Sequence, residues 1–109
     1  MKLNHHGPQD YQSLLMHQAA VRMLESDLSL IDKLLSILSD WDTRASIRSG
    51  PLRKKWVQII QERNWSLAVE ESETGNELRQ ASPMACILPN SVRFEIIRQV
   101  GALKDLQHA

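Results

Sequence analysis

The stretch LLMHQAAVRMLESDLSLIDKLLSIL, residues 14–38, repeats apolar residues at alternating intervals of three and four positions. This spacing is the a/d pattern of a heptad repeat, which makes one face of a helix apolar along its length. A second apolar row, from Met16 to Ile37, runs beside the first. We call the first row the main seam. It contains one polar member, His17, and consists of Leu14, His17, Val21, Leu24, Leu28, Ile31, Leu35 and Leu38.

The stretch predicts one long helix from about residue 8 to about residue 39. Pro8 suits the first turn of this helix, where a missing N–H costs nothing. Asp27 can cap the start of a new helix, so a break at Ser26–Asp27 is the alternative. Both apolar rows keep their phase through that point, and no Gly or Pro lies near it. The unbroken phase favours one continuous helix.

A helix of this length is large for a chain of 109 residues, which suits one small domain. We expect a flexible tail at residues 1–7 and a single helical domain over 8–109. The rest of so short a chain could hardly cover both apolar rows. The sequence therefore predicts a homodimer with a coiled-coil contact, in which one apolar row holds the shorter helices of its own chain and the other faces a second subunit. The main seam is the candidate interface, although the sequence does not decide between the two rows.

The remaining residues indicate an all-α bundle. Aromatic residues make up only 5% of the chain, and the β-branched and aromatic alternation of strands is missing. Ser49-Gly50-Pro51 and Pro89-Asn90-Ser91 are stop-and-restart signals between helices. We expect three to four shorter helices, and we expect Thr74-Gly75-Asn76 to interrupt or end the one that begins near Trp65.

Composition narrows the function classes. The 13 basic and 13 acidic residues cancel, so no overall field attracts nucleic acid or an anionic membrane. No apolar run approaches the roughly 18–20 residues that span a bilayer, and the first residues lack the apolar core of a signal peptide. We therefore expect a cytoplasmic protein without a membrane partner. The single cysteine, Cys86, excludes an internal disulfide and a multi-cysteine metal site.

A basic segment at residues 44–63 is the main candidate for binding nucleic acid. Trp56 and Trp65 lie in or beside it, and aromatic rings among cations can stack on bases. Trp56 is also in phase with an apolar stripe, which favours a core position. The acidic residues Glu70, Glu71 and Glu73 argue against a recognition helix over 65–73. The candidate contacts are Arg44, Arg48, Arg53, Lys54, Lys55 and Arg63.

Four further features could carry chemistry: a group of acidic residues, Cys86, His17 and Asp27. The carboxylates of Glu70, Glu71, Glu73 and Glu77 could hold a divalent metal, but bundle metal sites need Glu-x-x-His motifs, so we interpret them as a solvated face. Cys86 lies in an apolar piece of sequence, which favours a buried, inert thiol.

His17 could fix the register of a dimer or make it pH-sensitive. We favour the alternative, a histidine that lies partly exposed and hydrogen-bonded near a helix end. Asp27, in the second apolar row, poses the same question, with an Arg or Lys of another helix as its expected partner.

No phosphate-binding loop, nucleophile motif or metal-ligand spacing is present in the sequence. We therefore expect no catalytic residues, no cofactor and no metal. The leading hypothesis is a small non-enzymatic adaptor or regulatory protein that binds itself and another protein through helix faces. The alternative is a nucleic-acid-binding protein that uses the basic segment 44–63.

Overall fold

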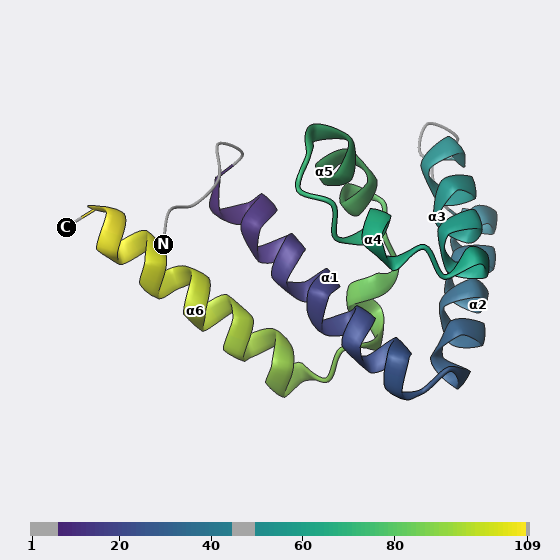
Figure 1. Cartoon of the computed structure of the whole chain (residues 1–109), viewed down its shortest axis with the longest axis horizontal. Coiled ribbons are helices and arrows are strands. Elements are labelled where there is room, and N and C mark those ends of the chain that lie inside the picture. Colours follow the sequence, from purple (N-terminus) through teal and green to yellow (C-terminus); the bar gives the residue numbers. More distant parts are fainter. Residues whose placement is uncertain (1–6, 45–49, 109) are drawn as a thin grey trace.

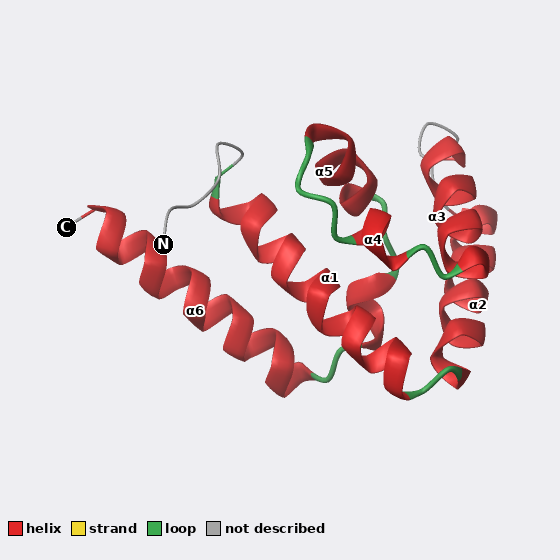
Figure 2. Cartoon of the chain, in the orientation of Figure 1, coloured by secondary structure: helices red, strands yellow, loops and turns green. Residues whose placement is uncertain are grey.

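The computed structural model describes residues 7–44 and 50–108, and the backbone alone for 104–108. These residues form helices and no strand, which confirms the all-α prediction (Figure 2). None of the helices in this part of the chain has the length and apolar content to cross a membrane. The predicted tail lies outside the described residues except for Gly7. In chain order the elements are α1 (Pro8–Ser26), α2 (Ser29–Arg44), α3 (Gly50–Glu62), α4 (Trp65–Ala68), α5 (Glu73–Gln80), the 3-10 turn η2 (Met84–Ile87) and α6 (Asn90–His108).

The long helix predicted over residues 8–39 is two helices, α1 and α2, because the chain bends at Asp27. The backbone of Asp27 is extended, with φ −143° and ψ 93°. Its carboxylate Oδ1 accepts hydrogen bonds from the Ser29 N–H at 3.1 Å and from the Ser29 hydroxyl at 2.6 Å. The cap thus satisfies a donor that the start of α2 would leave unpaired. The prediction of a single continuous helix, which rested on the unbroken phase of the apolar rows, was therefore wrong.

The bend lets both halves of the stretch face one core. Figure 1 shows α1 crossing the middle of the molecule, with the α2–α3 hairpin standing at one of its ends. Leu24 from α1, Leu34 from α2, Trp56 from α3 and Met84 from η2 are fully buried together. Leu34, a member of the second apolar row, therefore finds its cover within the same chain.

The last helix, α6, runs antiparallel to α1 along its other side (Figure 1). Among the described side chains of α6, Ile96 and Val100 are buried, and Val92 and Leu103 pack partly against the core. Arg93 also ties α6 to η2, since its Nη2 donates to the Ala85 carbonyl at 2.8 Å. α6 therefore forms one edge of the molecule and covers one flank of α1.

Gly75 lies in the first turn of α5 and does not interrupt a helix there, contrary to the sequence prediction. The hydroxyl of Ser72 caps this turn, accepting from the Gly75 N–H at 3.0 Å. A Cβ atom at Gly75 would lie 2.2 Å from the carbonyl oxygen of Glu70. The glycine is needed because the backbone of α5 passes so close to the preceding loop.

Candidate functional site: the groove between α1 and α6

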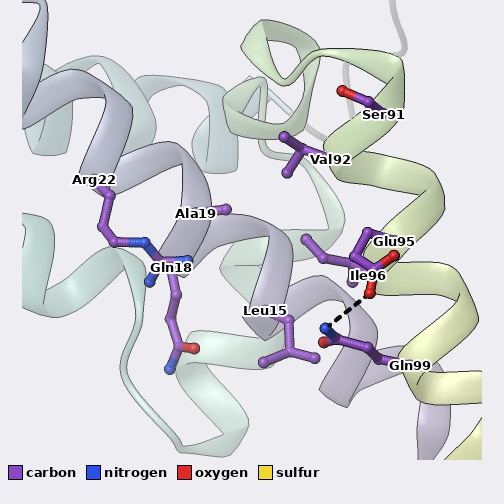
Figure 3. Close-up of a pocket in the computed structure, with 9 residues that line it drawn as sticks. All are labelled: Leu15, Gln18, Ala19, Arg22, Ser91, Val92, Glu95, Ile96 and Gln99. Carbon is purple, nitrogen blue, oxygen red and sulfur yellow. Dashed lines mark hydrogen bonds between the residues drawn. The ribbon is translucent and has the colours of Figure 1, made fainter.

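An open groove follows the line where α1 and α6 meet (Figure 3). It consists of two adjoining hollows of about 340 Å³ and about 510 Å³, which share Ala19, Arg22 and Val92. The second hollow extends to the bend between α1 and α2, where Asp27 and Leu30 line it. The groove therefore runs from the middle of α1 to its end.

The walls of the groove are mainly apolar. Leu15 and Ala19 from α1 face Val92 and Ile96 from α6 (Figure 3). The side chain of Ala19 is small, which leaves room between the two helices at this point. Met23 continues the α1 wall toward the bend. Such a channel between two helices suits the apolar face of a third helix.

Opposite charges lie on the two sides of this groove. Arg22, on α1, is exposed to solvent. Glu95, on α6, pairs with Arg98 one turn further along and accepts from the Gln99 amide at 3.4 Å. A ligand with a carboxylate on one side and a cation on the other would match this pair of charges.

Sequence reasoning missed the groove because its α1 wall belongs to neither of the two apolar rows in full. Leu15, Ala19 and Met23 are spaced four residues apart and therefore share a face of α1. That spacing was a usable signal, but the small size of Ala19 hid it beside the larger residues of the main seam.

The main seam lies mostly inside the chain. Its buried members are Leu14, His17, Val21, Leu24 and Leu38. Ile31 and Leu35 are partly buried and pack against the core, and Leu28 is 49% exposed at the bend. Dimerisation through this seam stays a prediction. Of the seam residues, a second subunit can reach only Leu28, Ile31 and Leu35 at the surface.

His17 is buried in the core, with 2% of its surface exposed. Its Nδ1 lies 2.7 Å from the Ser13 carbonyl oxygen and its Nε2 lies 2.7 Å from the Ser82 hydroxyl. In the neutral tautomer that fits both contacts, Nδ1–H donates to the carbonyl and Nε2 accepts from the hydroxyl. The expectation of a partly exposed histidine near a helix end was therefore wrong.

The surroundings of His17 favour the neutral ring. Burial lowers its pKa from 6.5 to about 4, an effect that the hydrogen bond to Ser13 opposes and the charge of Arg79 adds to. The ring also lies 5.7 Å from that of Trp56, between centroids. His17 thus joins α1 to the turn before η2, and its low pKa makes it a weak base near neutral pH.

The basic segment does not form one free cationic surface. Arg44 pairs with Asp40 on the same helix. Arg53 is buried, with its Nε 2.6 Å from Asp42 Oδ1. Arg48 lies outside the described residues. Two of the candidate contacts are therefore already engaged with carboxylates of the chain.

The other members of that segment remain at the surface. Lys54, Lys55 and Arg63 are exposed. Trp56 is fully buried, and its indole N–H donates to the Leu78 carbonyl at 2.6 Å. The core position inferred for Trp56 from its phase is correct, so this ring is not available to stack on a base.

The acidic residues and the cysteine lie on the surface. Glu70, Glu71, Glu73 and Glu77 are exposed. Within the described ranges, no group of three or more His, Cys, Asp or Glu side chains could hold a metal ion. Cys86 is also exposed, so the expectation of a buried thiol was wrong. The apolar neighbours Met84 and Ile87 are the ones that η2 turns inward.

Arg79 is a buried cation that sequence reasoning did not single out. Its Nη1 donates to the carbonyls of Ala68 at 3.2 Å and Glu70 at 2.9 Å, and its Nη2 donates to Asn76 Oδ1 at 2.7 Å. Burial is the main cause that lowers the pKa of this guanidinium. These bonds fix the loop between α4 and α5 against α5, which is a structural role.

Comparison of the chain with protein-family models, with curated proteins and with solved structures finds no match in any of the three.

Proposed function

We propose that this protein is a small non-enzymatic adaptor or regulatory protein that binds a helix of another protein in the groove between α1 and α6. The observation that supports this proposal best is the groove itself, with apolar walls and opposite charges along its sides. Helix-in-groove recognition uses such a channel, with anchors of the bound helix at positions i, i+3 or i+4, and i+7. We keep the cytoplasm, predicted from the sequence, as its proposed location.

The chemistry of the walls describes the partner. Leu15 and Val92 are half-buried and, with the buried Ala19 and Ile96 beneath them, give the groove an apolar lining, so the bound helix presents an apolar stripe to them. Arg22 on one side selects a carboxylate, and Glu95 on the other, which pairs with Arg98, accepts a cation of the partner in competition with Arg98. Because paired rim charges act mainly on specificity and on association rate, the apolar anchors supply most of the affinity.

The test is affinity capture from the source cell with three forms of the chain. Arg22→Glu reverses the charge at the groove, and Lys54→Glu with Lys55→Glu reverses two exposed charges on α3. We expect the wild type and the α3 variant to recover the same protein and Arg22→Glu to recover it poorly. Calorimetric titration with the purified partner would then test whether the binding is direct.

The same three forms separate the proposal from nucleic-acid binding. Binding through Lys54 and Lys55 would be lost in the α3 variant, kept in Arg22→Glu, and would fall steeply with added salt. That pattern, or equal recovery of the partner by all three forms, would refute the groove as the binding site. A capture with nothing above background would count against the adaptor function altogether.

A further inference from the structure

α6 carries a second apolar face that the fold leaves uncovered. Phe94 is 67% exposed and Ile97 is 45% exposed, although Ile96 and Val100 on the same helix are buried against α1. Phe94, Ile97 and Gly101 are spaced three and four residues apart, so they lie along one stripe of the helix. We call this row the α6 stripe. It points away from α1 and is distinct from the wall formed by Val92 and Ile96.

We propose that the α6 stripe binds the same stripe of a second copy of this chain, with the two α6 helices antiparallel across a two-fold axis near Ile97. This proposal does not depend on the groove function, since its apolar contacts, Phe94 and Ile97, lie outside the groove and Glu95 is the one residue that the two surfaces share. It also places the dimer contact on α6, where the sequence had placed it on the main seam.

The stripe is complementary to itself in shape. In an antiparallel pair centred beside Ile97, Phe94 of one copy lies opposite Gly101 of the other, because each is three or four residues from the centre. Gly101 has open space around it among the described residues, where no atom lies within 4 Å of the position that a Cβ would take. The phenylalanine ring of one helix therefore meets a position of the other where no side chain fills the space, and Ile97 packs near its own counterpart.

The charges beside the stripe are also complementary to themselves. Glu95 and Arg98 flank it on one side, with side chains that are 48% and 77% exposed. Because the second helix runs in the opposite direction, its Glu95 lies near Arg98 of the first helix, and its Arg98 lies near Glu95 of the first. A two-fold contact uses the same patch twice, so such a patch must carry both signs to avoid repulsion. This self-complementarity favours a second copy over an unrelated partner.

The first test measures the mass of the purified chain by analytical ultracentrifugation over a wide range of concentration. We expect a reversible change from 12.5 kDa to twice that mass as concentration rises. A wild type that stays monomeric at the highest concentration would overturn the proposal. Groove binding would be unaffected by that result, so the two proposals fail separately.

A matched pair of variants locates the contact. Ile97→Asp and Leu28→Asp change side chains of nearly equal exposure, 45% and 49%, on α6 and at the α1–α2 bend. We expect Ile97→Asp to weaken dimerisation at least about tenfold, because it places an unpaired charge in the contact. Leu28→Asp should leave it unchanged. The opposite result would move the contact to the main seam and overturn the proposal.

Two further variants test the antiparallel arrangement. Gly101→Gln should keep the monomer at least as stable, since Gln is a better helix former than Gly, yet weaken the dimer by occupying the space for Phe94. Glu95→Arg and Arg98→Glu should each weaken self-association, because each gives like charges across the axis. A mixture of these two variants should form a heterodimer. Failure of the mixture to associate, with a wild type that dimerises, would refute the antiparallel pairing.

Discussion

Lowering the pH from 7 to 4 should reduce the free energy of unfolding by about 3 kcal/mol through His17 alone. The pKa of this buried ring is lowered from 6.5 to about 4. One pKa unit corresponds to about 1.4 kcal/mol, so the gap between the two values gives about 3 kcal/mol. The side chain is 2% exposed, so solvent screening takes little from that figure.

The direction follows from which state binds the proton. Above pH 6.5 the His17 ring is neutral in both the folded and the unfolded chain, and its contribution to the free energy of unfolding is fully present. Between pH 6.5 and about 4 the His17 ring binds a proton in the unfolded chain and stays neutral in the folded chain. Stability therefore falls as the pH falls through this window, and the contribution is lost below it.

The assay is urea unfolding followed by tryptophan fluorescence, at several pH values and constant ionic strength. His17→Gln is the control, because it keeps a hydrogen-bonding side chain that does not titrate. The variant is less stable at pH 7, so the comparison concerns the slope of stability against pH. Equal slopes for both chains between pH 6.5 and 4 would refute the reasoning. NMR titration of the His17 ring supplies a direct check, and a midpoint near 6.5 would contradict its burial.

Two further predictions concern backbone positions. Gly75→Ala should lower the free energy of unfolding by about 2 kcal/mol or more, since its Cβ would lie 2.2 Å from the Glu70 carbonyl oxygen and the backbone must move. Gly101→Ala, in open space among the described residues of α6, should raise the free energy of unfolding by up to about 1 kcal/mol. Both variants are measured by chemical denaturation, and similar losses of stability at the two sites would contradict the close approach of Gly75 to the Glu70 carbonyl. Arg63, after the end of α3, has φ 54°, a left-handed conformation that costs a residue with a side chain about 1–2 kcal/mol. Arg63→Gly should therefore raise the midpoint of thermal unfolding, and a lower midpoint would show that the Arg63 side chain contributes more than its backbone costs.

The sequence predicted the fold class and much of the core, because heptad spacing and stop signals act locally. The main seam residues Leu14, Val21, Leu24 and Leu38 are buried, as apolar periodicity requires. The same periodicity could not show the bend at Asp27. Two helices joined by a two-residue turn kept the phase of one, and only the cap from Asp27 to Ser29 distinguishes them.

The candidate site was less accessible from sequence. The groove depends on where α6 lies relative to α1, a contact between segments about 75 residues apart in the chain. No local pattern specifies that placement. The engagement of Arg53 by Asp42 also depends on the α2–α3 hairpin, so a count of cations overstated the free basic surface. The exposure of Cys86 likewise follows from which side of η2 turns inward.

The position of α6 has a consequence for the order of folding during synthesis. Leu24, Leu34, Trp56 and Met84, which are fully buried, all precede α6 in the chain. They leave the ribosome before α6 does, so contacts within this part of the core can form earlier than the contacts with α6. Until α6 packs, Leu15 and Ala19 on α1 lack their cover from it. The same hierarchy should persist in the finished protein, with amide hydrogens of α6 exchanging through local opening sooner than those of α3.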